Sequence, residues 1–355
     1  MLPINILKTI LKNRFGLISL PSFCTYIITW RCNCRCKMCD VWKKTSEEEL
    51  KLDEIINIFK QLRLDAVRIT GGEPFLKEGL LEVVEAIQKY SKPEMIHITS
   101  NGILTERILS FFNKINNARN IHIKISIDAI GKKHDGLRGV ENAYNSAMKT
   151  VQELAKIRKE KKFYLAINQI IFNKEGLNDY NELKKICNPI KVPIHLVLAY
   201  EKVALYDPKN NVNLMPKKDN EFPCFSHLKE EEINEILEAL KKMVDAVPDF
   251  KERLILRYDL RGLHNRLIYK KGSPNPTCLV LKSHIRILPN GDVPICLSNS
   301  TIAGNLKKTT VKDLWFSKEI EKYRQLVKSC PGCWHECETI PSAIYSGDII
   351  RGLFY

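Results

Sequence analysis

The feature that most constrains the fold is a regular alternation between short β-rich runs and amphipathic helical stretches. The β-rich runs occupy residues 25–30, 66–70, 95–100, 121–128, 163–171 and 194–199. The segments between them, such as 51–62 and 141–160, have apolar residues at helical spacing and charged faces. This alternation predicts a parallel sheet. Because the runs are mostly apolar on both faces, we expect an α/β fold: a partial (β/α)6 TIM-like barrel under a ring of helices.

The pattern changes after the sixth β-rich run. Residues 201–228 contain three prolines and are typical of a long loop, and residues 230–247 have the spacing of a helix. From Cys278 onward, alternating apolar residues around Asn290-Gly291 predict a β-hairpin. We therefore divide the chain into an N-terminal amphipathic segment, a barrel, a helical linker and a small α+β domain, at residues 1–22, 23–228, 229–277 and 278–355.

The N-terminal segment has the pattern of an amphipathic helix. One helical stripe consists of Ile6, Leu7, Ile10 and Leu11. The basic residues near it are Lys8, Lys12 and Arg14. The stripe either docks on the body of the protein or contacts a membrane surface. No apolar run reaches the roughly 18 residues that a membrane span needs.

The composition indicates the cellular compartment and the class of partner that we expect. Twelve cysteines without a cleavable signal peptide indicate metal-bound thiolates in a reduced cytoplasm rather than a secreted disulfide scaffold. The net charge of +15 suits an anionic partner, but the lysines are scattered, as they are in any lysine-rich proteome. Aromatic residues are not interleaved with basic clusters, so we expect no nucleic acid partner.

Four cysteines follow the first β-rich run within eight positions. Cys32-x3-Cys36-x2-Cys39 places three thiolates on a tight loop, which suits a [4Fe–4S] cluster with one open iron. A structural zinc site requires a fourth ligand, and Cys34 is the candidate. Because single residues separate Cys34 from Cys32 and Cys36, we expect it to converge poorly with them and to be a small buried apolar residue.

This cysteine loop, "WRCNCRCKMC", resembles the signature of the radical S-adenosylmethionine (radical SAM) enzymes. "GGEP" at 71–74, "TSNG" at 99–102, and "SIDA" with "HDGLRG" at 126–129 and 134–139 agree with that family in order. Each follows a predicted strand, at the edge of the sheet where barrel active sites lie. The resemblance implies that the open iron binds S-adenosylmethionine (SAM) and that one electron cleaves SAM to methionine and a 5′-deoxyadenosyl radical.

The resemblance also implies a cofactor site at the ends of the strands. Gly71 and Gly72 would bring backbone close to the methionine amino group, with Glu73 near that cation. Arg138 is a candidate for the carboxylate or, alternatively, a salt-bridged surface arginine. The full set of expected cofactor-binding residues is Gly71, Gly72, Glu73, Pro74, Ser100, Asn101, Ser126, Asp128, Arg138 and Asn168.

A second group of cysteines lies near the C-terminus and resembles the auxiliary-cluster extensions of the same family, the SPASM or shortened twitch domains. Its members are Cys278, Cys296, Cys330, Cys333 and Cys337. The resemblance implies that the first four hold an auxiliary [4Fe–4S] cluster and that Cys337 is either a substitute ligand or not a ligand. Hairpin-plus-CxxC arrangements also bind zinc, which is the alternative.

The expected function is a radical SAM enzyme that abstracts hydrogen from an unidentified substrate, with the auxiliary cluster accepting an electron or holding that substrate. The family implies a peptide, a small molecule or a lipid-linked metabolite as substrate, and a ferredoxin or flavodoxin as electron donor. No leader-peptide-binding domain precedes the barrel, which disfavours a peptide. Tyr200 and Glu201 are candidates for proton transfer or plain surface residues. The rival class is a non-enzymatic iron–sulfur or zinc protein that binds nucleic acid.

Overall fold

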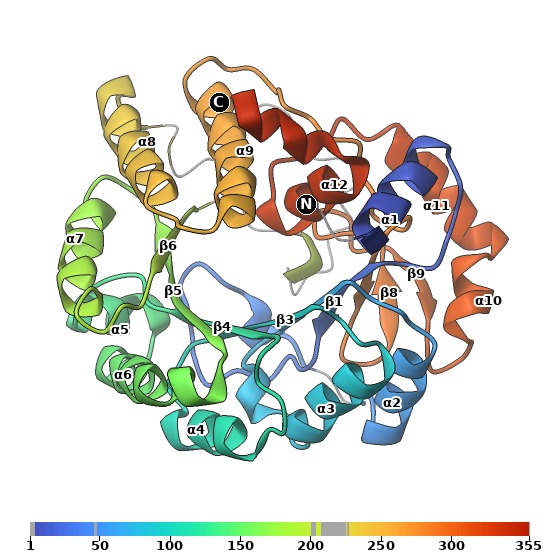
Figure 1. Cartoon of the computed structure of the whole chain (residues 1–355), viewed down its shortest axis with the longest axis horizontal. Coiled ribbons are helices and arrows are strands. Elements are labelled where there is room, and N and C mark those ends of the chain that lie inside the picture. Colours follow the sequence, from blue (N-terminus) through green and yellow to red (C-terminus); the bar gives the residue numbers. More distant parts are fainter. Residues whose placement is uncertain (1–3, 46–47, 200–203, 207–224, 226, 355) are drawn as a thin grey trace.

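A seven-stranded parallel sheet curves into an open barrel in the computed structural model, which describes residues 4–45, 48–199, 204–206, 225 and 227–354 (Figure 1). The strand order is β6-β5-β4-β3-β2-β1-β7. The α/β fold class predicted from the sequence is confirmed. The strands are β1 (Phe23–Ile27), β2 (Ala66–Thr70), β3 (Met95–Ser100), β4 (Ile121–Ser126), β5 (Tyr164–Ile171), β6 (Ile194–Leu198) and β7 (His284–Ile287).

The seventh strand comes from the C-terminal part of the chain. Strand β7 pairs in parallel with β1, with Cys24 opposite Ile285. The chain does turn tightly at Asn290-Gly291, where the Gly291 amide donates to the carbonyl of Leu288. The predicted hairpin across this turn is nevertheless wrong in its partners, because β8 (Asp292–Pro294) pairs antiparallel with β9 (Ile302–Asn305) in a second, two-stranded sheet.

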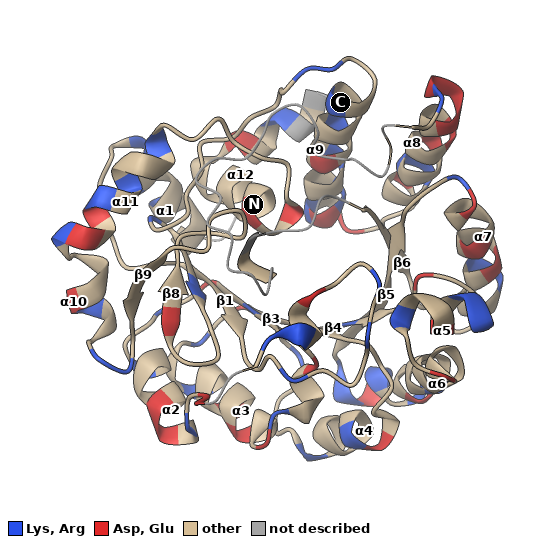
Figure 2. Ribbon diagram, turned by 180° about the vertical axis from the view of Figure 1, so that it is seen from behind, with Lys and Arg blue, Asp and Glu red and all other residues tan. Residues whose placement is uncertain are grey.

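Helices cover the outer face of the barrel (Figure 1), and Lys, Arg, Asp and Glu recur along them (Figure 2). Outward-facing strand residues such as Val67, Ile69 and Ile98 are fully buried beneath them. This burial of apolar side chains is the main force that holds the helices to the sheet. The covering helices are α2 (Leu52–Lys60), α3 (Leu80–Tyr90), α4 (Thr105–Lys114), α5 (Lys132–Arg138), α6 (Ala143–Lys161) and α7 (Gly176–Cys187).

The inner face of the barrel differs from the prediction that the strands are apolar on both faces. Burial alternates along β2, β3 and β4, with every second residue only half-buried. These half-buried positions include Arg68, His97, His122 and Lys124. The barrel interior is therefore polar, while its outer side forms the apolar core.

Three helices lie between the ends of the open barrel. Helix α8 (Glu230–Asp245) packs against β6 and α9 (Phe250–Leu267), and α9 packs against α12 (Glu336–Ser346). The Tyr258 ring of α9 stacks on the buried Trp334 at 5.8 Å. The helix predicted over 230–247 is thus confirmed, whereas Tyr200, Glu201 and most of the predicted loop 201–228 lie outside the described residues. Helices α10 (Val311–Trp315) and α11 (Lys318–Lys328) complete the C-terminal part.

Only part of the apolar stripe predicted for helix α1 (Ile4–Arg14) is buried. Ile10 is buried and Ile6 partly so, whereas 45% of Leu7 and 55% of Leu11 remain exposed. Asn13 fastens the helix by donating to Ser283 Oγ at 2.8 Å and to the Tyr345 carbonyl at 3.0 Å. The four residues therefore do not form one face. Among the described residues, no helix is long and apolar enough to cross a membrane.

Substituting Gly262 tests how tightly α9 packs against Trp334. A Cβ at this position would overlap the Trp334 ring. Because overpacking of a well-packed core costs about 1–3 kcal/mol, we expect Gly262→Ala to lower the free energy of unfolding by that amount in urea titrations. Gly272→Ala is the control, since nothing lies within 4 Å of a Cβ there. Equal stability of the two variants would contradict this packing.

Candidate active site

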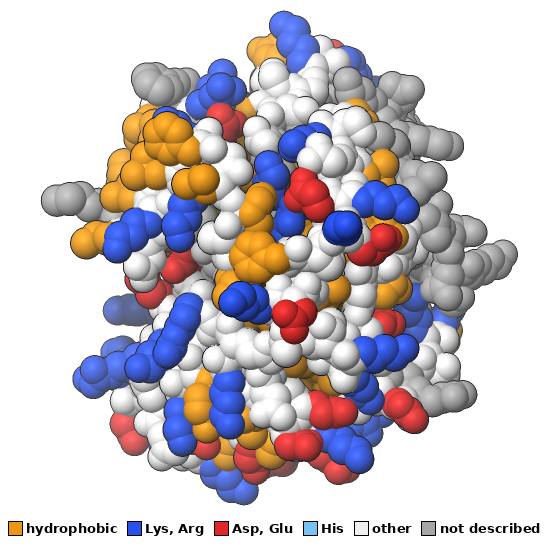
Figure 3. Space-filling model, turned by 90° about the vertical axis from the view of Figure 1, so that its right-hand side faces the viewer, with side chains coloured by type: hydrophobic (Ala, Val, Ile, Leu, Met, Phe, Trp, Pro, Cys, Tyr) orange, Lys and Arg blue, Asp and Glu red, His pale blue; other side chains and the backbone are white. Residues whose placement is uncertain are grey.

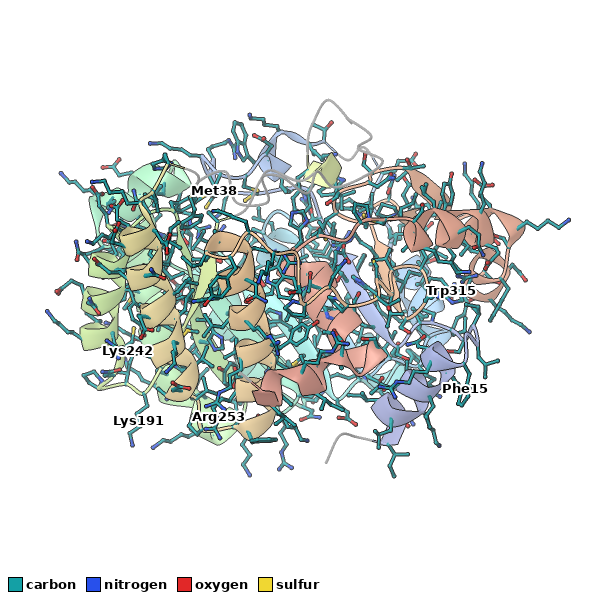
Figure 4. The ribbon with its side chains drawn as sticks, turned by 90° about the horizontal axis from the view of Figure 1, so that it is seen from above. Phe15, Met38, Lys191, Lys242, Arg253 and Trp315 are labelled. Atoms are coloured by element: carbon teal, nitrogen blue, oxygen red, sulfur yellow. The ribbon has the colours of Figure 1, made fainter. Side chains whose placement is uncertain are left out.

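The first cysteine cluster lies on the loop after β1, at the carboxyl end of the barrel. Met38, in this loop, and Lys191, which precedes β6, lie at opposite ends of the barrel (Figure 4). The loop is fastened to α5, because the Arg35 and Lys37 amides donate to the carbonyls of Arg138 and Leu137 at 2.8 and 3.0 Å. Distant parts of the sequence thus fix the cysteine loop at the rim.

The thiol of Cys34 lies between those of Cys32 and Cys36, and it forms side-chain hydrogen bonds with both. Cys34 is buried, as predicted, but the expectation that it converges poorly with its neighbours is wrong. Its hydrogen bond, followed by the charge of Arg138, lowers the pKa of the Cys36 thiol to about 6 against the effect of burial. Burial raises the pKa of Cys39 to about 11. Cys36 is therefore the readier thiolate of these two.

Gly71 and Gly72 let the loop after β2 pack directly on the chain leading into the cysteine loop. The amides of Gly72 and Glu73 donate to the carbonyls of Thr29 and Arg31, both at 2.8 Å. A Cβ at either glycine would overlap one of these carbonyl oxygens, and Gly71 also has a φ of +149°. The close approach of backbone to backbone explains both glycines without a ligand.

Glu73 is a buried carboxylate that joins the loops after β2 and β3. It accepts hydrogen bonds from Ser100 Oγ at 2.9 Å, from the Asn101 amide at 2.8 Å and from the Phe75 amide at 3.1 Å. Burial raises its pKa to about 7, although these donors favour the ionised form. Pro74 follows at the start of the short helix η2 (Pro74–Leu76). The expected residues Glu73, Ser100 and Asn101 are thus brought together.

Arg138 is buried, which excludes the alternative of a surface arginine. Its Nη2 forms an ion pair with Asp128 Oδ2 at 2.7 Å, and its Nη1 lies 3.8 Å from Cys36 Sγ. Asp128 also accepts a hydrogen bond from the Ile170 amide at 3.1 Å. Three expected site residues therefore form one chain of contacts from β5 to the cysteine loop.

Ser126, the last residue of β4, lies beside Asn168 in β5. Both are half-buried on the inner face of the barrel. Their register places two polar side chains next to the Asp128–Arg138 pair, where a ligand inside the barrel would meet them. On the other side of the rim, Asn101 Nδ2 donates to Asn33 Oδ1 of the cysteine loop at 2.7 Å.

Deeper in the barrel lies a polar network that the sequence analysis missed. Tyr164 OH is 2.8 Å from His195 Nε2, and His195 Nδ1 is 3.5 Å from Lys124 Nζ. Glu252, on α9, lies 3.4 Å from Tyr164 OH. The available signal was the alternation of polar residues with isoleucine in "AVRIT", "MIHIT" and "IHIKIS", which places Lys124 on one face with other polar residues. This signal does not include Tyr164, His195 or Glu252.

Four of the C-terminal cysteines lie near one another. The thiol of Cys333 lies close enough to Cys278 and Cys296 to interact with their charges, and Cys278 interacts in the same way with Cys330. Burial raises the pKa of Cys278 to about 12. Cys337 faces other groups, since its charge interacts with Lys124 of β4, with Arg286 of β7 and with Tyr206.

A buried carboxylate on α12 links this region to the barrel. Glu338 accepts hydrogen bonds from Arg286 Nη2 at 2.5 Å and from the Leu297 amide at 3.2 Å, and it lies 3.0 Å from His284 Nδ1. Burial opposes ionisation, but Arg286 and His284 together hold the pKa of Glu338 below its ordinary value. No group of three or more His, Cys, Asp or Glu side chains within the described part is placed to hold a single metal ion.

Two families match separate parts of the chain. Residues 26–186, from β1 into α7, match the Radical SAM superfamily. Residues 278–337, which contain all five C-terminal cysteines, match SPASM, an iron–sulfur cluster-binding domain. The two matches fall on the two cysteine regions described above.

Several curated proteins are similar to part of this chain. A GTP 3′,8-cyclase of Alkaliphilus oremlandii (strain OhILAs) is 38% identical over 110 residues, 29% of this chain and 33% of that protein. A GTP 3′,8-cyclase of Petrotoga mobilis (strain DSM 10674 / SJ95) is 28% identical over 179 residues, 45% of this chain and 49% of that protein. The chain thus spans between a third and a half of these relatives.

Solved structures share the fold over most of the chain. Streptococcus suis SuiB bound to precursor peptide SuiA has a TM-score of 0.60 and 17% identity, covering 90% of this chain and 70% of SuiB. The enzyme anSMEcpe with bound AdoMet has a TM-score of 0.54 and 15% identity, covering 94% and 95%. At these identities the likeness shows the fold, including its C-terminal part.

The Asp128–Arg138 pair yields a stability prediction. Removing one partner of a buried ion pair leaves an uncompensated charge, which costs about 3–5 kcal/mol. We expect Arg138→Met to lower the free energy of unfolding of the metal-free protein by this amount, and Asp128→Asn in the same chain to restore part of it. Lys156→Met is the control: it breaks the exposed pair with Glu153 and costs at most about 1 kcal/mol. A loss no larger than the control's would refute the pairing.

Proposed function

Because the chain belongs to the radical SAM superfamily of enzymes and carries a C-terminal SPASM domain, we propose that it reductively cleaves SAM and abstracts a hydrogen atom from a substrate held inside the barrel. The observation that carries the proposal is the convergence of the cysteine loop with Glu73, Asp128 and Arg138 at the carboxyl rim. All of these groups come from segments that follow strands, as barrel active sites require.

The two domains imply a SAM-binding [4Fe–4S] cluster, an auxiliary cluster and SAM as cofactors. Cys32, Cys36 and Cys39 fit the first cluster, because they share one loop and the pKa of Cys36 is already low enough for a thiolate near neutral pH. When bound, the cluster and SAM supply the one-electron cleavage that yields methionine and a 5′-deoxyadenosyl radical. Cys34 hydrogen-bonds to two of these thiols and is proposed to orient them rather than to bind iron.

The residues of the chain hold this site rigid. We propose that Glu73 keeps the loops after β2 and β3 in place, and that Arg138 neutralises charge beside Cys36 while Asp128 fixes its guanidinium. Ser126 and Asn168 are the polar groups proposed to meet SAM inside the rim. The loop after β2 is shaped by Gly71, Gly72 and Pro74.

The substrate is proposed to be a polar small molecule. The barrel interior offers both signs of charge, because Lys124 lies within electrostatic reach of Glu252, Glu336 and Arg68. Burying such groups costs free energy unless a polar partner meets them, so an apolar substrate would fit poorly. The GTP 3′,8-cyclases are named for a small molecule, which supports this choice over a peptide such as the one bound to SuiB.

The auxiliary cluster is proposed to sit on Cys278, Cys296, Cys330 and Cys333, with Cys337 turned toward the barrel interior. There it would accept the electron left on the substrate or hold the substrate. A ferredoxin or flavodoxin is the proposed electron donor.

Loss of the three proposed ligands tests the first cluster. We expect the combined Cys32→Ala, Cys36→Ala and Cys39→Ala variant to form no 5′-deoxyadenosine when reconstituted protein is incubated anaerobically with SAM and dithionite, because thiolates must bind the iron. Cys34→Ala is the matched control from the same loop and should keep most of the product. If Cys34→Ala were equally inactive, Cys34 would have to be counted as a ligand. Failure of the unmodified protein to form 5′-deoxyadenosine would refute the proposed function.

Removal of two auxiliary ligands separates the roles of the clusters. Fully reconstituted protein should bind about eight irons per chain, since two four-iron clusters are proposed. The Cys330→Ala, Cys333→Ala variant should bind about four and still cleave SAM without substrate, because the barrel site is distinct. Iron analysis and 5′-deoxyadenosine formation are the measurements, with folding checked by circular dichroism. About four irons with one zinc in the unmodified protein would assign the C-terminal site to zinc.

A further inference from the structure

Helix α1 has a second apolar stripe that the body of the protein leaves uncovered. Ile4, Leu7 and Leu11 are 70%, 45% and 55% exposed, and Phe15, just past the helix, is 76% exposed. These residues follow one another at intervals of three or four, so they share one side of a helix with about 3.6 residues per turn. The space-filling view of this side of the molecule shows the hydrophobic side chains gathered in a patch (Figure 3).

The orientation of the stripe is fixed by the opposite side of the helix. Thr9 and Ile10 are buried there, and Thr9 Oγ1 lies 3.0 Å from Ser22 Oγ. Ile10 also packs against Gly347, where a Cβ would lie 3.2 Å from the isoleucine. The helix is therefore held with its exposed stripe directed outward, and Phe15 lies at the outer edge of the molecule (Figure 4).

Basic side chains border the stripe on both sides. With about 3.6 residues per turn, Lys8 and Lys12 lie along one edge of the stripe and Arg14 along the other. The helix contains no acidic residue, and the whole chain has a net charge of +15. An apolar stripe between rows of cations matches the boundary of a bilayer, where acyl chains meet anionic headgroups. Another protein surface would have to supply acidic groups around an apolar groove.

We propose that α1 binds the surface of an anionic bilayer, with Ile4, Leu7, Leu11 and Phe15 in the outer part of the acyl layer and the basic residues on the headgroups.

This placement decides which end of the barrel faces the membrane. Phe15 lies at the same end as Lys191, opposite to Met38 of the cysteine loop (Figure 4). The bilayer would therefore lie at the amino end of the strands, and the rim that carries the site would remain open to a substrate and an electron donor. The inference is independent of the radical chemistry.

Co-sedimentation with vesicles tests the proposal. The reconstituted full-length protein is mixed with vesicles of phosphatidylcholine alone or of phosphatidylcholine with phosphatidylserine. We expect binding to the anionic vesicles, a fall of at least about tenfold in the partition coefficient for Leu7→Ser with Leu11→Ser, and a fall of about fivefold for each of Lys8→Gln and Lys12→Gln. Leu52→Ser with Ile186→Ser is the matched control, because both residues are exposed on other helices, and it should bind normally.

Several results would overturn the proposal. They are no sedimentation with anionic vesicles, binding to neutral vesicles as strong as to anionic ones, or an unchanged partition coefficient in the Leu7→Ser, Leu11→Ser variant. Analytical ultracentrifugation tests the alternative that a second copy of the chain covers the stripe. A dimer that is lost in the Leu7→Ser, Leu11→Ser variant would assign the stripe to that second copy. Formation of 5′-deoxyadenosine is assayed on the same preparation, so failure of membrane binding and failure of the proposed function are separate results.

Discussion

The site depends on direct contact between two loop backbones at the carboxyl edge of the sheet. The loop after β2 donates two amide hydrogen bonds to the carbonyls of Thr29 and Arg31, just ahead of the first cysteine. Only glycines at 71 and 72 leave room for this approach. The cysteine loop is then held from its other side by α5, through Arg35 and Arg138. A loop that carries several thiols close together is thereby held from both sides.

Charge in the molecule is distributed by layer. The outer helices carry many Lys, Arg, Asp and Glu residues (Figure 2), the strands beneath them are apolar on their outer side, and the barrel interior is polar again. Interior groups such as Lys124 and His195 are costly to bury, because burial lowers the pKa of both. Such groups are retained where they meet a ligand or one another. This arrangement is the physical basis for proposing a polar substrate.

The C-terminal part of the chain contributes directly to the barrel. Strand β7 extends the main sheet, Trp334 packs on α9, and Glu338 pairs with Arg286 of β7. The same segment carries the cysteines proposed for the auxiliary cluster. A change at that cluster would therefore affect the barrel wall through the ion pair between Glu338 and Arg286. At the opposite end, α1 is held by a few polar contacts and leaves its apolar stripe outside.

The sequence by itself determined the features that depend on neighbouring residues. Short β-rich runs and the helical spacing between them identified six strands and the intervening helices. The order of "GGEP", "TSNG" and "SIDA" at the ends of strands placed Glu73, Ser100 and Asp128 at one edge, since parallel strands end together. Tertiary structure alone decided which distant segments meet. The pairing of β7 with β1, the burial of Arg138 against Asp128, the position of Cys34 between two thiols and the division of the α1 stripe all depend on contacts between residues far apart or on loop conformation. Local periodicity does not predict such contacts, because they depend on how the whole chain packs.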